Sequence, residues 1–566
     1  MNKKSLNNKR RAIASMLGVL MIAQQSVGIQ AFAVTNITDV NNNQLKPSQT
    51  SGQYNITPDV KNGDVGFRKF NDFTLDKGDI ANFIMKYYNQ GAWTDSNGNV
   101  TNHETGTWDI NTFVAAVKNQ VNIDGVVNTL RSMNGDVGGN LILVSPNGVV
   151  VGASGVLNVG SLSVITPTQT EYDVFADKIK NAPVYGQTVT VQDGDSTHTM
   201  TGYFGAGDTD LTVPTFTIDS AQTVDVAGRI AANGNINVQT GTFATQDGSI
   251  IAAGVNNSGK GINAVGADTL FNSLVKTGNT SNIDVTTNKG VNIVNGSIVQ
   301  NLGNGNTTIT NTGADGVLVA GTLTNSNGNL TINNTGANGI GISGTVKNSN
   351  GILDAINSGK SGINISGTVE NTGTTNITNQ AGGTDGIKLT STGRINNHGS
   401  SLNITNDATG GIDLRGVITG DNKALVNVTS NNSNVTIGDK ANEHNIIADN
   451  TVTVNVTNGD FLNNGVTTNH IVTSDGADLV INATNGAIGE ELVCANGICT
   501  GIGPNGRDLT KSINTSVDGT IKAISSRGDR NKSVVNMASI DKDMNIDQIK
   551  ADGRVILLAD SSTSGK

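Results

Sequence analysis

Residues 339–346 read GIGISGTV, and residues 362–369 read GINISGTV. The same phrase, a glycine followed by alternating aliphatic residues and a second glycine, recurs at 316–323 and 411–418. A fifth copy at 386–395 carries two extra residues. The first glycines of successive copies stand 23, 23, 24 and 25 residues apart. A repeat period in the twenties is typical of solenoid proteins, in which each repeat forms one turn of a stack.

Side-chain parity within the phrase predicts a β-strand. Ile363, Ile365 and Val369 share one parity and are therefore expected to point to the same face. Gly367 has that parity too, and we expect a corner there that leaves no room for a side chain. The two extra residues of the fifth copy preserve the parity.

A second strand is expected in each period, at 330–332, 352–356, 376–378 and 402–404. A weaker copy of the phrase, starting at Gly290, slips by one residue at Ile298, which predicts a bulge or a longer corner. No period can bury its apolar row alone, so the rows must stack on one another. The chain is therefore predicted to be all-β, a parallel β-helix with roughly thirteen turns between residues 250 and 566, spaced about 4.8 Å apart. A disordered stalk is the alternative, but disorder would not keep aliphatic parity over so many residues.

Composition limits the partners. Only 14% of the 566 residues are charged, and the formal net charge is -10 with a pI near 5.0. An acidic chain gives no electrostatic support for binding a phosphate backbone, so a nucleic-acid partner is disfavoured.

The N-terminus has the pattern of a secretory signal peptide. Basic residues lead into the apolar run 12–23, and Ala-Phe-Ala at 31–33 offers a small-residue cleavage site. We expect cleavage after Ala33, which makes Val34 the first residue of the mature chain. No later stretch is long and apolar enough to suggest a transmembrane segment in the mature chain.

The two cysteines lie close together in the sequence. Cys494 and Cys499 bracket an Asn-Gly pair, the preferred two-residue hairpin turn. Such a turn makes them a non-hydrogen-bonded cross-strand pair, close enough to form a small structural disulfide. A redox motif or metal site is the alternative, but no other cysteine exists and no histidine lies near in sequence.

Aromatic residues separate a front region from the repeats. Sixteen of the twenty aromatic residues lie between Tyr54 and Phe216, which predicts a bulkier core there. Two segments, 80–87 and 110–117, place apolar residues at i, i+3, i+4 and i+7 behind an aspartate, as an amphipathic helix would. Short helices are therefore expected, with irregular strands as the alternative for both.

Residues 119–163 read as strand, tight turn, strand, turn and strand. Ser145, Pro146, Asn147 and Gly148 form the central turn, because proline fixes φ and glycine accepts a positive φ. The phrase VLNVG follows at 156–160 and includes Asn158 and Gly160. Residues 145–148, considered without the rest of the sequence, are explained by an ordinary turn between two coils.

This segment resembles the N-terminal secretion domain of two-partner-secretion exoproteins, the filamentous haemagglutinin and haemolysin family. Within the family it is most similar to the filamentous adhesins grouped with the fusobacterial leukotoxin. The resemblance covers roughly residues 56–250, and its most specific part is the Ser145–Gly148 turn with Asn158 and Gly160. The family's usual Asn-Pro-Asn-Gly has a serine here, and no second Asn-Pro-Asn-Leu motif is found, which leaves the transporter subtype open.

The resemblance implies a right-handed parallel β-helix that crosses the outer membrane through a partner barrel and ends secreted, or on the outer surface, in a diderm bacterium. The implied domains are a signal peptide (1–33), a secretion domain (34–250) and a β-helix repeat region (251–566). An insertion is expected at about 166–218, with a helix near 171–180. The chain is also expected to be a piece of a longer exoprotein.

The sequence offers no catalytic, cofactor-binding or metal-ligating set. The five histidines are scattered along the sequence, and none belongs to a known metal-binding or catalytic motif. A glycan-cleaving β-helix would need stacked carboxylates, and Asp354, Asp385 and Asp413 fall at different points of the period. We therefore expect no enzyme and no cofactor, but an adhesin whose receptor or glycan is undetermined. The alternatives are a polysaccharide-degrading enzyme or the stalk of a toxin.

One tripeptide suggests a weaker binding hypothesis. The tripeptide Arg527-Gly528-Asp529 has a sequence that mimics integrin ligands when it is exposed on a loop. Chance occurrence in a Gly- and Asp-rich chain is the alternative. The repeated Asn-x-Thr/Ser triplets are interpreted as polar turns and stacked asparagine rows instead of glycan acceptors.

Overall fold

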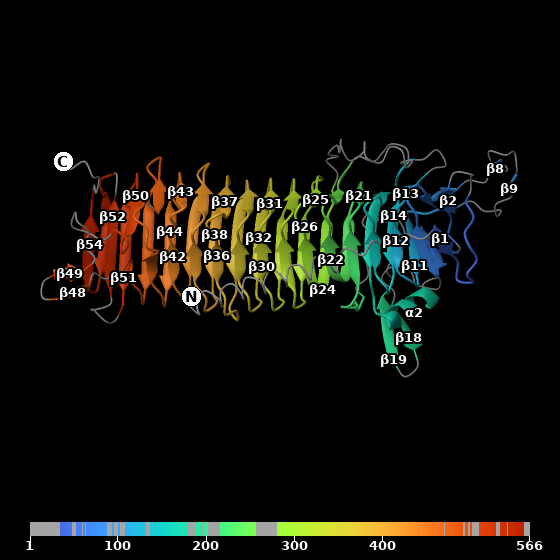
Figure 1. Cartoon of the computed structure of the whole chain (residues 1–566), viewed down its shortest axis with the longest axis horizontal. Coiled ribbons are helices and arrows are strands. Elements are labelled where there is room, and N and C mark those ends of the chain that lie inside the picture. The colour runs from blue at the N-terminus through green and yellow to red at the C-terminus, as the bar shows by residue number, and fades with distance from the viewer. Residues whose placement is uncertain are drawn as a thin grey trace, which may run out of the picture.

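The computed structural model of the chain is a rod built from three faces of stacked parallel strands (Figure 1). The front region lies at one end and the C-terminal strands at the other (Figure 1). The structure describes residues 34–47, 52–58, 60–62, 64–87, 93–94, 100–101, 108–131, 136–178, 188–193, 196–201, 216–255, 280–442, 444–468, 470–490, 493–495, 498–500, 509–527, 533–539 and 542–559.

Face A contains the longer strand of most coils. Its paired strands, in order along the rod, are β4 (Val65–Phe70), β11 (Thr112–Val117), β14 (Asn140–Val144), β17 (Ser161–Ile165), the first half of β22 (Ile236–Thr245), the first half of β24 (Ile283–Ile293), β26 (Thr307–Asn311), β29 (Leu330–Asn334), β32 (Ile352–Asn357), β35 (Thr374–Asn379), β38 (Ser401–Asn406), β41 (Leu425–Ser430), β44 (Val452–Thr457), β47 (Leu479–Thr484), β51 (Ile521–Ser526) and β53 (Ile546–Ala551).

Face B follows face A in each coil, and its strands are short. They are β5 (Asp72–Leu75), β12 (Val121–Ile123), β15 (Val149–Val151), β20 (Thr223–Val226), the second halves of β22 and β24, β27 (Gly316–Val319), β30 (Ile340–Ile342), β33 (Ile363–Ile365), β36 (Ile387–Leu389), β39 (Ile412–Leu414), β42 (Val435–Ile437) and β45 (Phe461–Asn463).

Face C closes the coil before the chain returns to face A. Its strands are β2 (Gln53–Ile56), β6 (Ile80–Ile84), β13 (Val126–Leu130), β16 (Val156–Val159), β21 (Arg229–Ala232), β23 (Ile250–Ala253), β25 (Ile298–Asn301), β28 (Thr322–Asn325), β31 (Thr345–Asn348), β34 (Thr368–Asn371), β37 (Arg394–Asn397), β40 (Val417–Gly420), β43 (Ile446–Ala448), β46 (Ile471–Thr473), β50 (Ile513–Ser516), β52 (Val534–Ser539) and β54 (Arg554–Leu558).

The remaining elements do not belong to the three parallel faces. β1 (Asn36–Thr38) pairs antiparallel with β5, and β3 (Val60–Asn62) pairs antiparallel with β4. The helix α2 (Gln169–Lys178) is followed by an antiparallel hairpin of β18 (Thr188–Asp193) and β19 (Ser196–Thr201), which projects from the rod (Figure 1). Three further antiparallel pairs join β7 (Lys86–Tyr87) to β10 (Trp108–Asp109), β8 (Trp93–Thr94) to β9 (Val100–Thr101), and β48 (Val493–Ala495) to β49 (Ile498–Thr500).

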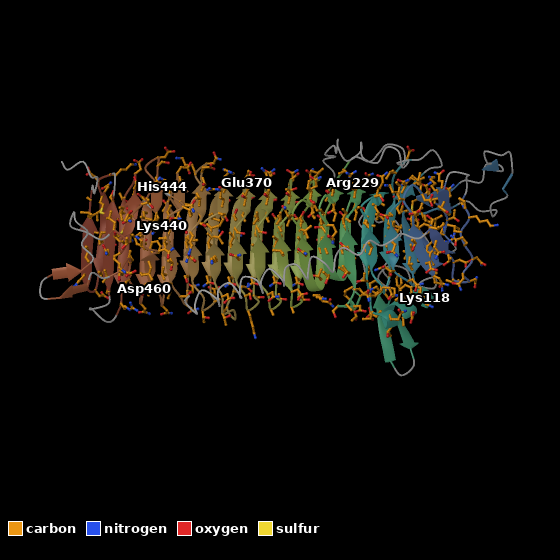
Figure 2. All side chains as sticks on the ribbon, in the orientation of Figure 1. Lys118, Arg229, Glu370, Lys440, His444 and Asp460 are labelled. Atoms are coloured by element: carbon orange, nitrogen blue, oxygen red, sulfur yellow. The ribbon has the colours of Figure 1, made fainter. Side chains whose placement is uncertain are left out.

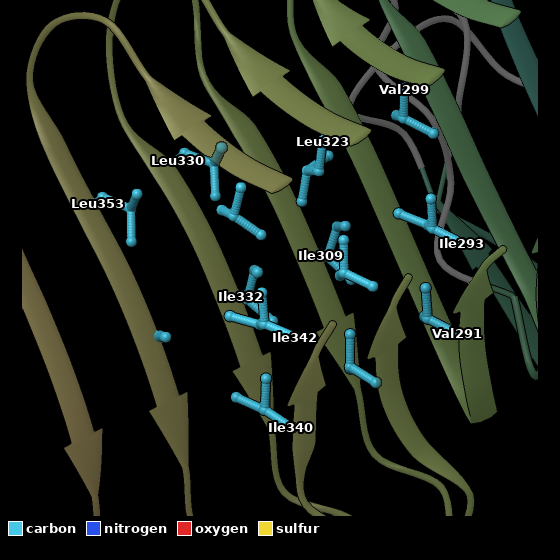
Figure 3. Packing of buried hydrophobic residues seen from close by; sticks show 14 of the residues in the cluster. Val291, Ile293, Val299, Ile309, Leu323, Leu330, Ile332, Ile340, Ile342 and Leu353 are labelled. Carbon is cyan, nitrogen blue, oxygen red and sulfur yellow. The ribbon is translucent and has the colours of Figure 1, made fainter. Parts of the chain in front are cut away.

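The core runs along the axis of the rod. One buried cluster extends from Ile37 to Met537, and alternate residues of each strand supply it. Figure 3 shows aliphatic side chains from successive coils pointing into this interior. From β27 to β45 the inward row of face B consists of six aliphatic residues followed by a phenylalanine: Val317, Ile340, Ile363, Ile387, Ile412, Val435 and Phe461. Each fully buried aliphatic side chain contributes about 1.5–3 kcal/mol, so stacking stabilises coils that could not fold alone.

The predicted parallel β-helix is confirmed, including the parity of the repeated phrase and the two-residue insertion at 386–395. The slip at Ile298 is a longer corner: Ser297 N–H donates to the Val294 carbonyl, and Val299, not Ile298, is the buried residue. Among the described residues after position 250, face A has eleven strands, β24 to β53, fewer than the roughly thirteen turns expected. The difference arises because some coils are longer, for example 42 residues from Leu479 to its partner Ile521.

The helices predicted at 80–87 and 110–117 are wrong. The first segment forms β6 and β7, and the second contains all of β11, whose side chains are buried on both faces. Phe83 and Phe113 point into the central core, while Ile80 and Val114 belong to apolar clusters on the outer side. A strand that is buried on both faces loses its polar alternation and can mimic helical spacing. The helix expected near 171–180 is present as α2.

Candidate functional site

The Ser145–Gly148 turn forms the corner between β14 on face A and β15 on face B. Ser145 is fully buried, and its hydroxyl donates to the Asn119 carbonyl of the preceding coil (2.9 Å). The Ser145 hydroxyl also accepts the Asn147 N–H (3.2 Å). The exposed Asn147 side chain donates its amide to the Lys118 carbonyl (2.8 Å). The turn is therefore joined to the corner of the neighbouring coil by side-chain hydrogen bonds.

Gly148 is required at this corner for two reasons. Its φ is +88°, a backbone angle that residues other than glycine rarely adopt. A Cβ at this position would also lie 2.8 Å from the Thr223 carbonyl oxygen of the next coil. The glycine thus lets two corners approach closely.

Asn158 and Gly160 lie on another part of the coil. Asn158, on face C, is buried and donates its side-chain amide to Asn128 (3.3 Å), which donates to Asn82 (3.0 Å). A Cβ at Gly160 would overlap the backbone of Gly139 at the corner between faces C and A. Ser145 and Gly139 flank opposite ends of β14, so the structure does not bring the two halves of the predicted motif into one surface.

The front coils are buried on their outer side as well as inside. Residues Tyr172 and Phe175 of α2, with Phe216, pack on the outside of face A against side chains such as Val114 and Ile142. The rings of Phe175 and Phe216 meet edge to face, with centroids 5.2 Å apart. On the outside of face C a second apolar cluster is buried, made of Ile80, Val126, Val156, Ala231, Ala252 and Val255. From β24 to β47 the strands of the rod alternate instead between buried residues and residues that are at least partly exposed.

The residues of the predicted signal, including Ala33, lie outside the described part of the chain. Val34, the expected first residue of the mature protein, is 83% exposed. Export and cleavage remain predictions.

The cysteine pair lies in a hairpin, as expected. β48 and β49 are antiparallel, and Cys494 lies opposite Cys499 in their register. Asn496 and Gly497 of the expected turn lie outside the described residues, and the disulfide remains a prediction.

Arg527 of the Arg-Gly-Asp tripeptide is held against the rod. Its guanidinium donates to the Asp460 carboxylate (3.1 Å), and its backbone N–H donates to Asp552 (3.1 Å). Gly528 and Asp529 lie outside the described residues, so the integrin-like hypothesis remains untested.

The titratable residues do not converge on one site. Within the described residues, no three His, Cys, Asp or Glu side chains are grouped closely enough to hold a metal ion. Asp354 lies on face A, Asp413 on face B, and Asp385 just before β36. His470 is fully buried, and neither ring nitrogen has a hydrogen-bond partner among the described residues. Burial lowers the pKa of its imidazole from 6.5 to about 4.

The asparagines form stacked rows, as predicted. One buried row runs through Asn311, Asn334, Asn357, Asn379 and Asn406, each side-chain amide donating 2.8 Å to the next. A second joins Asn325, Asn348 and Asn371 (3.1 and 3.2 Å). A third row, on the outside of face A, joins Asn376, Asn403 and Asn427 (2.8 and 2.9 Å). Each of these three begins an Asn-x-Thr triplet, so this is the row that the interpretation of the triplets predicted, whereas the asparagines of the two buried rows lie outside such triplets.

No helix among the described residues combines the length and the apolar character needed to span a bilayer. Comparison with protein families finds no family model that matches the chain, and comparison with curated proteins finds no significant relative.

Proposed function

We propose that the protein is exported by a partner outer-membrane barrel and acts outside the cell as an adhesin-like rod. The observation that carries the proposal is the Ser145–Gly148 corner in a front region whose coils are buried on both sides, followed by a long, regular β-helix. The N-terminal pattern of basic, apolar and small residues supports export. A solenoid can also fold coil by coil as it emerges from a narrow barrel.

The proposed activity is binding, not catalysis. Asp354, Asp385 and Asp413 lie at different places around the coil, so they give no paired carboxylates for glycan cleavage. The acidic net charge argues against nucleic acid as the ligand.

The export proposal can be tested with two glycine variants. Gly148 and Gly316 each stand just before or at the start of a face B strand, with φ of +88° and +76°. A Cβ would lie 2.8 Å from the Thr223 carbonyl at the first and 2.5 Å from the Gly339 carbonyl at the second. Gly148→Val and Gly316→Val therefore disturb the corner to a similar extent, but only the first lies in the proposed recognition region.

In a diderm host that co-expresses the partner barrel, we expect Gly148→Val to abolish secretion and Gly316→Val to retain it. Immunoblotting of medium and periplasm measures the two pools. Asn147→Ala, which removes an exposed side chain from the same corner, should also reduce secretion. Equal secretion of all variants would contradict the recognition role, and equal loss from both glycine variants would reduce it to a folding effect.

A further inference from the structure

The outward surface of face A is almost free of charge along the rod. From β26 to β47 its outward side chains are Thr, Asn, Ser and a few aliphatic residues, and Asp354 is the one charged residue among them. By contrast, face B carries Lys388 and Asp413, and face C carries Lys347 and Glu370. In Figure 2 the labelled Arg229 and Glu370 lie along one long edge of the rod, and Lys118 and Asp460 lie along the other. From β26 to β47, face A thus forms a strip with a single charged side chain, here called the neutral strip, on an acidic protein.

Hydrogen bonds hold the central row of this strip in place. The side-chain amide of Asn376 donates to Asp354 (2.8 Å), that of Asn403 to Asn376 (2.8 Å), and that of Asn427 to Asn403 (2.9 Å). Each amide uses one hydrogen in the row, and among the described residues the other hydrogen has no partner. The row therefore presents donors at strand spacing, about 4.8 Å, in side chains that are already ordered. Ordered side chains lose less entropy when a ligand binds.

Two exposed aliphatic side chains flank the same four strands. Ile352 and Leu425 are 38% and 41% exposed, and the register places Thr374 and Ser401 between them. Three strand spacings separate them, roughly 14 Å. The strip thus combines a row of hydrogen-bond donors with two exposed aliphatic side chains along the rod.

We propose that the outward surface of β32, β35, β38 and β41 binds a linear, uncharged polysaccharide laid along the rod. Sugar hydroxyls can bond to the amide row, and the C–H faces of pyranose rings can pack on Ile352 and Leu425. A pyranose in an extended chain advances by a distance similar to the strand spacing, so successive sugars meet successive coils and weak contacts add up. The inference rests on the proposed attachment function and deepens it by naming a ligand class.

Other partners fit this surface less well. An anionic glycan or nucleic acid would approach an acidic protein at a strip without cations. A second copy of the chain would need a larger apolar or aromatic interface core than two aliphatic side chains provide.

Binding of cellohexaose, chitohexaose and hexagalacturonate to the purified mature chain, measured by calorimetry, tests the proposal. We expect the neutral hexasaccharides to bind and hexagalacturonate not to bind. Asn403→Asp, and Ile352→Ser combined with Leu425→Ser, should each weaken binding about tenfold, equivalent to the loss of about 1.4 kcal/mol.

Matched controls place the same changes on face B. Asn364→Asp replaces an exposed asparagine of β33, and Leu318→Ser replaces a 44% exposed leucine of β27. Both should bind as the unchanged chain does. Circular dichroism melting of every variant separates a lost surface from a lost fold.

The inference is overturned if neither neutral hexasaccharide binds, if hexagalacturonate binds better, or if well-folded face A variants bind like the face B controls. Self-association that Leu425→Ser abolishes would overturn it in favour of a second copy. Because the assay uses purified protein, it is independent of the transporter. A chain that binds glycan but is not secreted with the barrel contradicts the export proposal alone.

Discussion

His470 makes the stability of the rod sensitive to acid. Its ring is fully buried, no residue in the described part of the chain forms a hydrogen bond with it, and burial lowers its pKa from 6.5 to about 4. The unfolded chain therefore binds a proton as the pH falls below 6.5, while the folded chain does not until about pH 4. The stabilisation from the neutral ring is complete above pH 6.5 and is lost as the pH falls, by about 2 kcal/mol between pH 7 and 5.

Urea unfolding at pH 7 and pH 5 measures this loss. His470→Phe, which cannot titrate, should show a smaller decrease in the unfolding midpoint than the unchanged chain. His398→Gln changes a histidine that is paired with Asp421 at a partly exposed site, and it serves as the histidine control. The same decrease in all three proteins would contradict a role for His470.

Gly367 is required because of the neighbouring coil. A Cβ there would overlap the Gly344 carbonyl of the preceding coil, whereas one at Gly341 would meet only the end of the Leu318 side chain. We expect Gly367→Ala to destabilise the protein by about 1–3 kcal/mol, as overpacking does. Gly341→Ala should leave the thermal midpoint nearly unchanged, and equal midpoints for the two variants would contradict the crowding argument.

At the scale of elements, the repeated phrase predicted the strands well because each strand from β26 to β47 is buried on one face only. Alternation then identifies the strand and its inward side, as in Ile363 and Ile365. The front strands could not be predicted this way. β6 and β11 are buried on both faces, and the spacing of the apolar residues in them matched that of a helix. The outer cover that causes this comes partly from α2, which is far from β11 in the sequence.

The buried asparagine row ties the strands of neighbouring coils together. Asn357 accepts the amide of Asn334 and donates to Asn379, both at 2.8 Å, with no exposed surface. We expect Asn357→Ala to destabilise the protein by about 1–3 kcal/mol, since it leaves buried polar groups unpaired. Asn364→Ala, an exposed change in the next face B strand, should have little effect on the urea midpoint. A midpoint loss as large as that of Asn357→Ala would refute the role of the row.

At the scale of the whole molecule, the sequence predicted a stack but not how its surfaces differ. Parity indicates which side chains point outward, yet which outward rows lie together depends on corners of variable length. The strands of the neutral strip on face A are 22 to 27 residues apart, and only the register aligns Asp354, Asn376, Asn403 and Asn427. The proposed secretion motif shows the reverse: Ser145 and Gly160 are only fifteen residues apart in the sequence, yet Gly160 lies against Gly139, at the end of β14 opposite to Ser145.

Solution X-ray scattering of the purified mature chain tests most directly whether the molecule grows by stacking. In the part of the chain that the structure describes, face C contains seventeen strands, which at about 4.8 Å each give a rod of roughly 80 Å with the cross-section of a single coil. We predict a pair-distance distribution that peaks at the width of one coil and falls in a long linear tail. A symmetric, bell-shaped distribution, as a compact globule of this length gives, would contradict the account.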